Sequence, residues 1–161
     1  MSDPRTGVPH AVRGKTWEEM RVGDSFRTAA RTITESDLTT FVNLCGFNEP
    51  LFYDAHHAAE GGYEGRLVPG ALVYAIGEGL VIQTHSFAGT GLAFMHMELD
   101  VRGPTVVGDT LDVVVEITSS RASSKPGRGV VTSRNRVYNE RGDTVLVYEP
   151  VRLVRGRDFS A

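Results

Sequence analysis

The stretch CGFNEPLFYDAHH, residues 45–57, gathers the side chains of this sequence that are best suited to acid–base chemistry. Glu49 precedes a proline, and Tyr53 and His57 follow it within the next eight positions. Carboxylate, phenol and imidazole groups can each transfer protons between a substrate and water. A glutamate withdrawn from water has its pKa raised toward neutral pH, whereas a solvated loop glutamate does not. The sequence leaves both interpretations of Glu49 open.

The neighbours of these residues have structural explanations. Asp54 is suited to cap a short helix, because its carboxylate can accept the first free N–H groups. His56 and His57 are adjacent, so at most one of them can face a site, and surface positions are the default. Cys45 has no basic neighbour in the sequence and is interpreted as a small buried hydrophobe. His96 is interpreted as a structural or interface histidine.

Two features of the pattern are unexpected. Phe47 and Phe52 lie in a loop, although loops usually run over the surface and carry polar side chains. Glu78 interrupts an apolar run, although a buried charge without a partner is costly. Glu78 is therefore expected to pair with an arginine or to lie at an exposed helix end.

The helices that must position these residues follow from periodicity. Thr34 and Asp37 form a capping-box pattern, and apolar residues at helical spacing then predict a helix to about residue 45, with Gly46 as its stop. A short helix is predicted over 54–60. The run 69–82 opens with Pro69, which is favourable in a first turn, and it is apolar around its whole circumference. A helix buried on all sides is predicted there.

Elsewhere the hydrophobic period is two. A strand is predicted over 25–33, and four further strands are predicted over 92–101, 111–117, 129–139 and 144–154. Pro150 within the last of these predicts an edge strand or a bulge. This order predicts an α+β fold, in which an antiparallel sheet of about five strands wraps around one apolar helix. The sheet edges would be covered best by dimerisation.

The bulk composition excludes several classes of protein. With 161 residues, 40% of them hydrophobic and 23% charged, the chain is expected to form one domain over 15–157 after a flexible arm over 1–14. A net charge of −3 without a long basic run argues against nucleic-acid or anionic-membrane partners. A single cysteine, no secretory signal and no run long enough to span a bilayer favour a cytoplasmic protein. No metal-ligand spacing is present, so neither a metal nor a separate cofactor is expected.

Four segments, residues 14–60, 66–80, 101–117 and 124–146, together resemble the MaoC-like hot-dog dehydratases, the (R)-specific enoyl-CoA hydratase group. The resemblance covers roughly residues 14–155. It implies a hot-dog fold and either a homodimer or a pairing with a second hot-dog subunit. It also implies an acyl thioester of coenzyme A or of an acyl carrier protein as the ligand, with coenzyme A present only as part of that substrate.

The resemblance departs from the family at the catalytic motif. In the family this loop reads Asp, any residue, Asn, Pro, any residue, His, and the Asp and His transfer protons around one water. Aligned on Pro50, the Asp position is Phe47, the Asn position is Glu49 and the His position is Phe52. A phenyl ring transfers no proton, but it packs well against an acyl chain.

The remaining site residues implied by the resemblance surround the thioester. The glycine that begins the central helix, whose N–H faces the thioester oxygen in the family, is retained as Gly70, and it follows Pro69 where the family often has His. Arg66, Lys125 and Arg128 are candidates to contact coenzyme A phosphates, although a solvated charge cluster explains them equally well.

Three hypotheses follow. The chain is a hydratase or dehydratase variant that uses Glu49, Tyr53 or His57, or a non-catalytic acyl-binding subunit that pairs with an active partner. The third is a thioesterase that uses Glu49.

Overall fold

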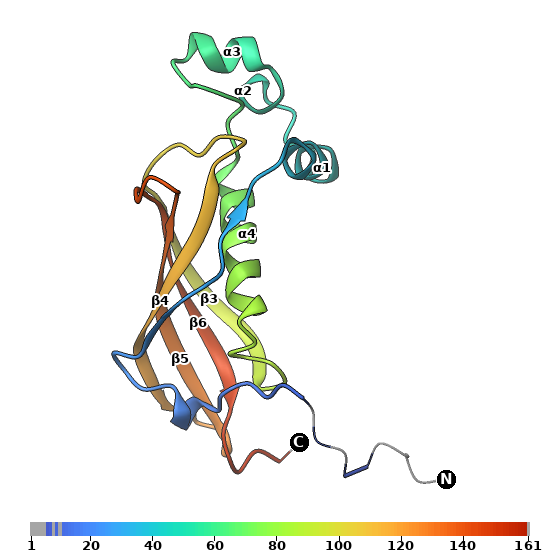
Figure 1. Cartoon of the computed structure of the whole chain (residues 1–161). Helices are drawn as coiled ribbons and strands as arrows, with labels where there is room; N and C mark the ends of the chain where they lie inside the picture. The colour runs from blue at the N-terminus through green and yellow to red at the C-terminus, as the bar shows by residue number, and fades with distance from the viewer. Residues whose placement is uncertain (1–5, 8, 10, 161) are drawn as a thin grey trace.

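A computed structural model of the chain describes residues 6–7, 9 and 11–160. Its helical elements are η1 (Trp17–Glu19), α1 (Glu35–Cys45), α2 (Pro50–Tyr53), α3 (Ala55–Glu60) and α4 (Gly70–Gln83). Its strands are β1 (Ser25–Arg27), β2 (Arg31–Thr32), β3 (Gly91–Val101), β4 (Thr110–Ala122), β5 (Arg128–Tyr138) and β6 (Thr144–Arg155). Figure 1 shows the sheet and α4 as the body of the molecule, with α2 and α3 at one end and the β4–β5 turn at the other.

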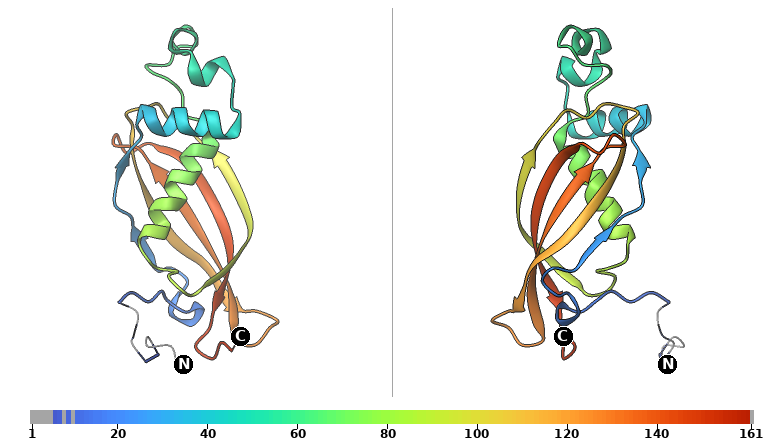
Figure 2. Two further views of the ribbon diagram at one scale, coloured as in Figure 1. Left: turned by 90° about the vertical axis from the view of Figure 1, so that its right-hand side faces the viewer. Right: turned by 60° about the vertical axis from the view of Figure 1, so that its left-hand side comes forward.

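The antiparallel sheet curves around α4, so the predicted hot-dog arrangement is confirmed (Figures 1 and 2). Its strand order is β1-β4-β5-β6-β3, and β2 also pairs with β4. Alternate residues of β4 are buried, and the four predicted from the period of two are 0 to 3% exposed: Leu111, Val113, Val115 and Ile117. Ile117 packs in a smaller cluster with Met20, whereas the other three belong to the cluster that contains α4. Side chains of α4 fill the space above them, which places the core between one helix and one face of the sheet.

Two strand predictions need correction. The strand expected over 25–33 is divided into β1 and β2, because the Val113 N–H donates to the Thr28 hydroxyl (3.0 Å) and that side chain occupies the ladder. Of the two alternatives predicted for Pro150, the edge strand is wrong, because β6 runs between β5 and β3. The alternative of a bulge agrees better, since the β3–β6 register shifts between Phe94 and His96, beside the position of Pro150. The missing N–H of Pro150 is accommodated where the pairing with β5 is interrupted, between Val151 and Tyr148.

Helix α1 confirms the capping prediction. The Asp37 N–H donates to the Thr34 hydroxyl, the Asp37 carboxylate accepts the Thr34 N–H at 2.9 Å, and Gly46 ends the helix with φ 70°. The bond from the Thr34 N–H lowers the pKa of the Asp37 carboxyl. The interpretation of Cys45 as a buried hydrophobe is wrong: the thiol is exposed, because Cys45 is the last residue of α1 and lies beyond Val42, the last buried residue of that helix.

Helix α4 is not buried on all sides. Leu72, Ile76 and Leu80 face the sheet, whereas Ala71, Ala75 and Ile82 are exposed on the opposite side. A curved sheet covers only the face of the helix turned toward it (Figure 2). One apolar face of α4 therefore lies open in the single chain.

Strand β3 forms an edge of the sheet and also carries exposed apolar side chains. These are Phe94, Met95, Leu99 and Val101. An unpaired edge with apolar residues favours association with another strand.

The N-terminal part of the chain is attached to the body from Gly14 onward. The Gly14 N–H donates to the Ala88 carbonyl (2.8 Å), and the Lys15 N–H donates to the Ser86 carbonyl (2.9 Å). Of the arm predicted over 1–14, residues 1–5, 8 and 10 lie outside the described part of the chain. Among the described residues, no helix combines the length and the apolar character needed to cross a membrane.

Candidate functional site

The N-terminal end of α4 opens into a pocket of about 340 Å³. Pro69 caps the helix with extended backbone, and its carbonyl accepts the N–H groups of Leu72 and Val73. Within the described residues, the N–H groups of Gly70 and Ala71 have no backbone acceptor. Free N–H groups at a helix start carry the positive end of the helix dipole, so they favour an oxygen with negative charge.

Gly70 brings this helix end close to the neighbouring strand. A Cβ added at Gly70 would lie 3.0 Å from the Val101 Cγ2 atom, which is closer than such contacts normally are. Val101 and Arg102 line the pocket beside Gly70. The pocket therefore lies between the start of α4 and the end of the edge strand β3.

The pocket wall is largely apolar. Its other members come from α2, from the segment before α4, from α4 itself, from the loop after β3 and from the start of β6: Phe52, Tyr63, Leu67, Val68, Pro69, Val73, Gly103, Pro104, Thr105, Val145 and Leu146. The Thr105 hydroxyl is buried without a hydrogen-bond partner among the described residues. The titratable side chains of the wall are Tyr63 and Arg102, and the wall contains neither a carboxylate nor an imidazole.

Three phenylalanines connect the loop to this wall. The ring centroids of Phe41 and Phe47 are 5.1 Å apart, and those of Phe47 and Phe52 are 6.1 Å apart, both pairs tilted. Gly46 reverses the chain after α1, and Pro50 begins α2, so the rings of Phe47 and Phe52 return against Phe41. Phe52 is half-buried and lines the pocket, as predicted, whereas Phe47 is 36% exposed behind it.

Arg66 holds the loop in place. Its Nε and Nη2 atoms donate to the Phe52 carbonyl at 3.2 and 2.9 Å, and its Nη1 atom pairs with the Glu35 carboxylate. The guanidinium that was expected to contact a phosphate is thus bonded between α1 and α2 within the chain. It positions Phe52 at the pocket.

The candidate acid–base residues do not reach the pocket. Glu49 is exposed at the start of α2, Tyr53 is 52% exposed, and His57 is exposed on α3. Asp54 caps α3 as predicted: the N–H groups of His56 and His57 donate to its carboxylate, and these bonds lower the pKa of the Asp54 carboxyl. Proximity in sequence to Phe52 therefore did not place these groups at the helix end: of the residues of α2, Phe52 lines the pocket and Tyr53 does not, and α3 projects away from the body (Figure 1).

Lys125 and Arg128 lie at the opposite end of the molecule from Gly70. Lys125 is in the turn between β4 and β5, Arg128 begins β5, and the Arg128 guanidinium lies over the Phe159 ring at 5.3 Å. Within one chain they therefore do not lie beside the thioester site, where they were expected. His96 is exposed on the edge strand β3, a position consistent with an interface residue.

Glu78 pairs with an arginine, one of the two outcomes expected from its sequence context. Arg152 Nη2 donates to its two carboxylate oxygens at 2.6 and 2.8 Å, and the Tyr148 hydroxyl donates to it at 2.9 Å. Burial, followed by the nearby Glu78 carboxylate, raises the pKa of Tyr148, so its hydroxyl remains a donor. This pair bridges the middle of α4 and β6, away from the pocket at the helix start.

Sequence reasoning missed Tyr63, Arg102 and Thr105 as pocket residues. Each comes from an irregular segment, and the isolated bridge between Leu67 and Val106 brings those segments together. A bridge between residues so far apart in sequence leaves no periodic signal. No group of His, Cys, Asp and Glu side chains able to hold a metal ion occurs among the residues that the structure describes.

Comparison with known proteins places these features in context. A family model described as "FAS1-like, dehydratase domain region" matches residues 20–147. The (R)-specific enoyl-CoA hydratase of Aeromonas caviae is 27% identical over 134 residues, which are 83% of this chain and 95% of that protein.

Solved structures agree with these matches. A MaoC-like dehydratase from Rhodospirillum rubrum superposes with a TM-score of 0.80 at 26% identity, covering 91% of this chain and all of that one. A Mycobacterium tuberculosis protein with a double hot-dog fold gives a TM-score of 0.80 at 21% identity. This chain is covered over 92% of its length but accounts for 46% of that protein, so it corresponds in fold to one half of a paired unit.

Proposed function

The chain belongs to the FAS1-like dehydratase region family and has the MaoC-like hot-dog fold, and on this premise we propose that it binds an acyl thioester at the start of α4. The acyl group would occupy the apolar pocket, and the thioester carbonyl oxygen would accept the Gly70 N–H. The ligand class is a thioester of coenzyme A or of an acyl carrier protein. One observation supports this most strongly: the pocket joins free helix N–H groups to an apolar wall.

The same pocket argues for binding without chemistry by this chain alone. Hydration of an enoyl thioester requires a base that deprotonates water and an acid that protonates carbon. The pocket wall contains no carboxylate and no imidazole. The resemblance, aligned on Pro50, implies that Phe52 stands where the family has its histidine. We therefore propose a thioester-binding subunit, with the proton-transfer groups supplied by a second hot-dog chain.

A hydratase or dehydratase that carries its own acid and base is the second candidate. It is favoured by the family match, which spans residues 20–147 and so includes the loop with Glu49, Tyr53 and His57. These residues lie on α2 and α3, close in the chain to Phe52 but outside the pocket wall. The thioesterase hypothesis is less well supported, because it requires a carboxylate at the thioester and Glu49 does not line the pocket.

Association through the β3 edge would complete the site. The pocket reaches the edge strand at Val101, and α4 begins beside the same end of that strand, where Gly70 approaches Val101. A second hot-dog unit paired along β3 would cover the exposed apolar residues of both elements. We propose this pairing for two copies of the chain or for the chain with a catalytic partner.

We expect the purified protein to hydrate crotonyl-CoA no faster than buffer, because its own pocket lacks both proton-transfer groups. The measurement is the loss of enoyl-thioester absorbance over time. The same assay is run on the Glu49→Gln variant. Rapid turnover that is lost in Glu49→Gln would support the second candidate instead, and rapid turnover that survives it would show that the acid and base lie elsewhere in the chain.

The apolar wall predicts a dependence on chain length. Phe52→Ala should weaken the binding of long acyl-CoA ligands by roughly tenfold, since losing the burial of about 60 Å² of apolar surface at about 25 cal/mol per Å² corresponds to that factor. Binding of acetyl-CoA should change little, because its acyl group is too short to cover the ring. Isothermal titration across a series of chain lengths measures the effect.

Tyr53→Ala is the matched control for this series. Tyr53 is the next residue on the same helix, is aromatic and lies outside the pocket wall. An equal loss of affinity at every chain length, or the same loss in both variants, would contradict an acyl pocket bounded by Phe52.

A further inference from the structure

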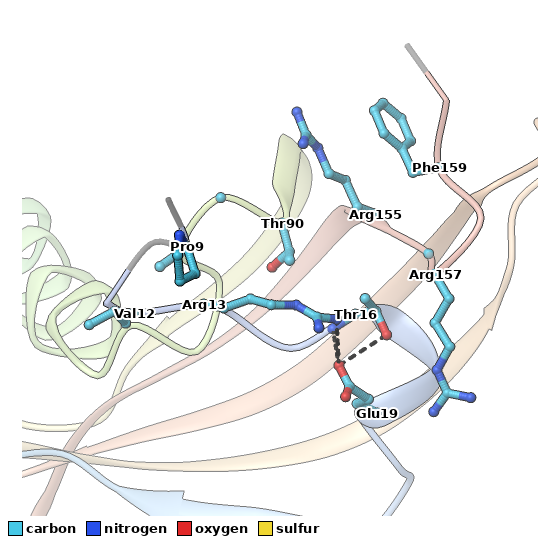
Figure 3. A pocket seen from close by; sticks show the side chains of 12 residues that line it. Pro9, Val12, Arg13, Thr16, Glu19, Thr90, Arg155, Arg157 and Phe159 are labelled. Atoms are coloured by element: carbon cyan, nitrogen blue, oxygen red, sulfur yellow. Dashed lines mark hydrogen bonds and ion pairs between the residues drawn. The ribbon is translucent and has the colours of Figure 1, made fainter. Parts of the chain in front are cut away.

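A second cavity, of about 970 Å³, is drawn in Figure 3. It lies by the start of β3 and the end of β6, at the end of the molecule opposite the start of α4 and the thioester pocket (Figure 1). It is formed where residues 9 and 12–19, the loop 88–90 and the chain from the end of β6 onward meet. The bonds from Gly14 and Lys15 to the 86–88 loop hold one wall, and the bond from the Arg155 N–H to the Thr90 carbonyl (2.8 Å) holds another. The cavity is therefore built by backbone pairing between three distant parts of the chain.

The charge of this cavity is opposite to that of the whole chain. Arg13, Arg155 and Arg157 line it, against the single carboxylate of Glu19, although the chain carries a net charge of −3. Figure 3 shows Arg13 extending toward Thr16 and Glu19, with Arg155 and Arg157 on different sides. The Glu19 carboxylate accepts the Thr16 N–H (2.8 Å) and hydroxyl (3.1 Å), and the first of these bonds contributes most to lowering its pKa.

The uncharged groups of the cavity are also suited to an anion. The Thr90 side chain is 5% exposed, and its hydroxyl has no hydrogen-bond partner among the described residues. The Gly89 N–H likewise has no acceptor within the described part of the chain. The Arg155 guanidinium lies over the Phe159 ring at 4.6 Å, which limits its movement. Arginines with free donors beside them recognise phosphate groups, because several N–H groups can bond to the phosphate oxygens at once.

The cavity and the thioester pocket lie at the two ends of strand β3. Thr90 in the cavity immediately precedes β3, and Val101 in the pocket ends it, so the two sites lie at opposite ends of one edge strand. The 11 residues of β3 span about 35 Å at the usual rise of a strand. Two copies of an edge strand related by a twofold axis perpendicular to the sheet must pair antiparallel. Such a pair places the cavity of each protomer at the pocket end of the other.

We propose that this basic cavity binds phosphate groups of the thioester carrier, and that in the β3-paired molecule it serves the thioester pocket of the other protomer. The inference rests on the proposed function, since it needs a thioester carrier as the ligand. It also accounts for Arg128, which lies beside the cavity over the Phe159 ring, as a contributor to the phosphate site. The relevant chemistry is a phosphate ester, found both in the nucleotide of coenzyme A and in the phosphopantetheine of a carrier protein.

The phosphate site is tested with adenosine 3′,5′-bisphosphate, 4′-phosphopantetheine and a long-chain acyl-N-acetylcysteamine, which has a thioester but no phosphate. Arg155→Gln with Arg157→Gln should weaken the binding of at least one phosphate probe by tenfold or more, and that binding should fall as salt is added. The acyl-N-acetylcysteamine should bind unchanged. The matched control is Arg121→Gln, which alters an exposed arginine outside the cavity.

These probes separate the possible failures. Preference for the bisphosphate indicates the nucleotide of coenzyme A, and preference for phosphopantetheine indicates a carrier protein. If the phosphate-free thioester binds but neither phosphate probe responds to the arginine changes, the cavity proposal is refuted and the proposed function stands. If the phosphate probes respond but no thioester binds, the proposed function fails, and with it the assignment of this cavity to a thioester carrier.

The cross-protomer arrangement is tested with mixed pairs, in which one chain carries the two arginine changes and the other carries Phe52→Ala. If each site uses the pocket of one protomer and the cavity of the other, a mixed pair keeps one site in which both parts are intact. Titration with palmitoyl-CoA should then find one ligand per pair bound with the affinity of the unaltered protein. Mixed pairs in which every site is weakened would show that both parts belong to the same chain, and light scattering at the monomer mass would refute the pairing itself.

Discussion

Replacing Glu78 by leucine should lower the free energy of unfolding by about 3 to 5 kcal/mol, the usual cost of removing one partner of a buried ion pair. The Glu78 carboxylate lies between α4 and β6, where it accepts two bonds from Arg152 and one from the Tyr148 hydroxyl. Arg152 is 6% exposed, so without Glu78 its charge would remain buried. Urea unfolding of Glu78→Leu beside the unaltered protein measures the loss.

Two further variants isolate the cause of that loss. In Glu78→Leu with Arg152→Met both charges are absent, and most of the stability should return, because apolar side chains of similar volume often replace a buried pair without loss. The return should be partial, since the Tyr148 hydroxyl still lacks its acceptor. Glu64→Leu, at an exposed loop position, is the control and should change stability by less than about 0.5 kcal/mol. A single Glu78 variant as stable as this control would contradict the ion-pair interpretation.

Gly70→Pro should abolish most of the contribution of the helix end to thioester recognition, whereas Gly70→Ala should retain it. Both changes add a Cβ near Val101, where the approach is 3.0 Å, so both carry the same added contact. Only proline removes the N–H. Proline is well tolerated at the first position of a helix, and the extended backbone of Pro69 (φ −54°, ψ 138°) is compatible with a following proline.

The expected size of the difference depends on what the helix end stabilises. For a bound thioester, one neutral hydrogen bond contributes about 1 kcal/mol, so Gly70→Pro should bind butyryl-CoA roughly fivefold more weakly than Gly70→Ala. If a partner subunit supplies the acid and base, the N–H would face the negative oxygen of the transition state, and turnover should fall about 10²- to 10³-fold. Calorimetry and turnover in the presence of the partner measure the two effects. Equal affinity of the two variants would show that the Gly70 N–H does not contact the ligand.

The amino-acid sequence determined those features that depend on residues within a few positions of one another. The capping pair Thr34 and Asp37, the stop at Gly46 and the cap at Asp54 were predicted and are confirmed. Local hydrogen bonds and hydrophobic periodicity specify these elements, because each involves neighbours along a single turn or strand. The long apolar run and the strands with a period of two then allowed only a helix packed against a sheet.

Only the tertiary structure decided which of these elements meet. Phe52, Pro69 and Gly70 were expected to lie together and do so, but Glu49, Tyr53 and His57 are exposed outside the pocket wall.

The contacts of three arginines could not be predicted from the sequence either. Arg66 is bonded within the chain, Arg128 lies at the far end of the sheet, and Arg152 meets Glu78 across 74 positions of sequence. Contacts of this kind depend on the register between strands and on the path of loops. Those are determined by the packing of the whole chain, and they leave no periodic pattern in the sequence from which to predict them.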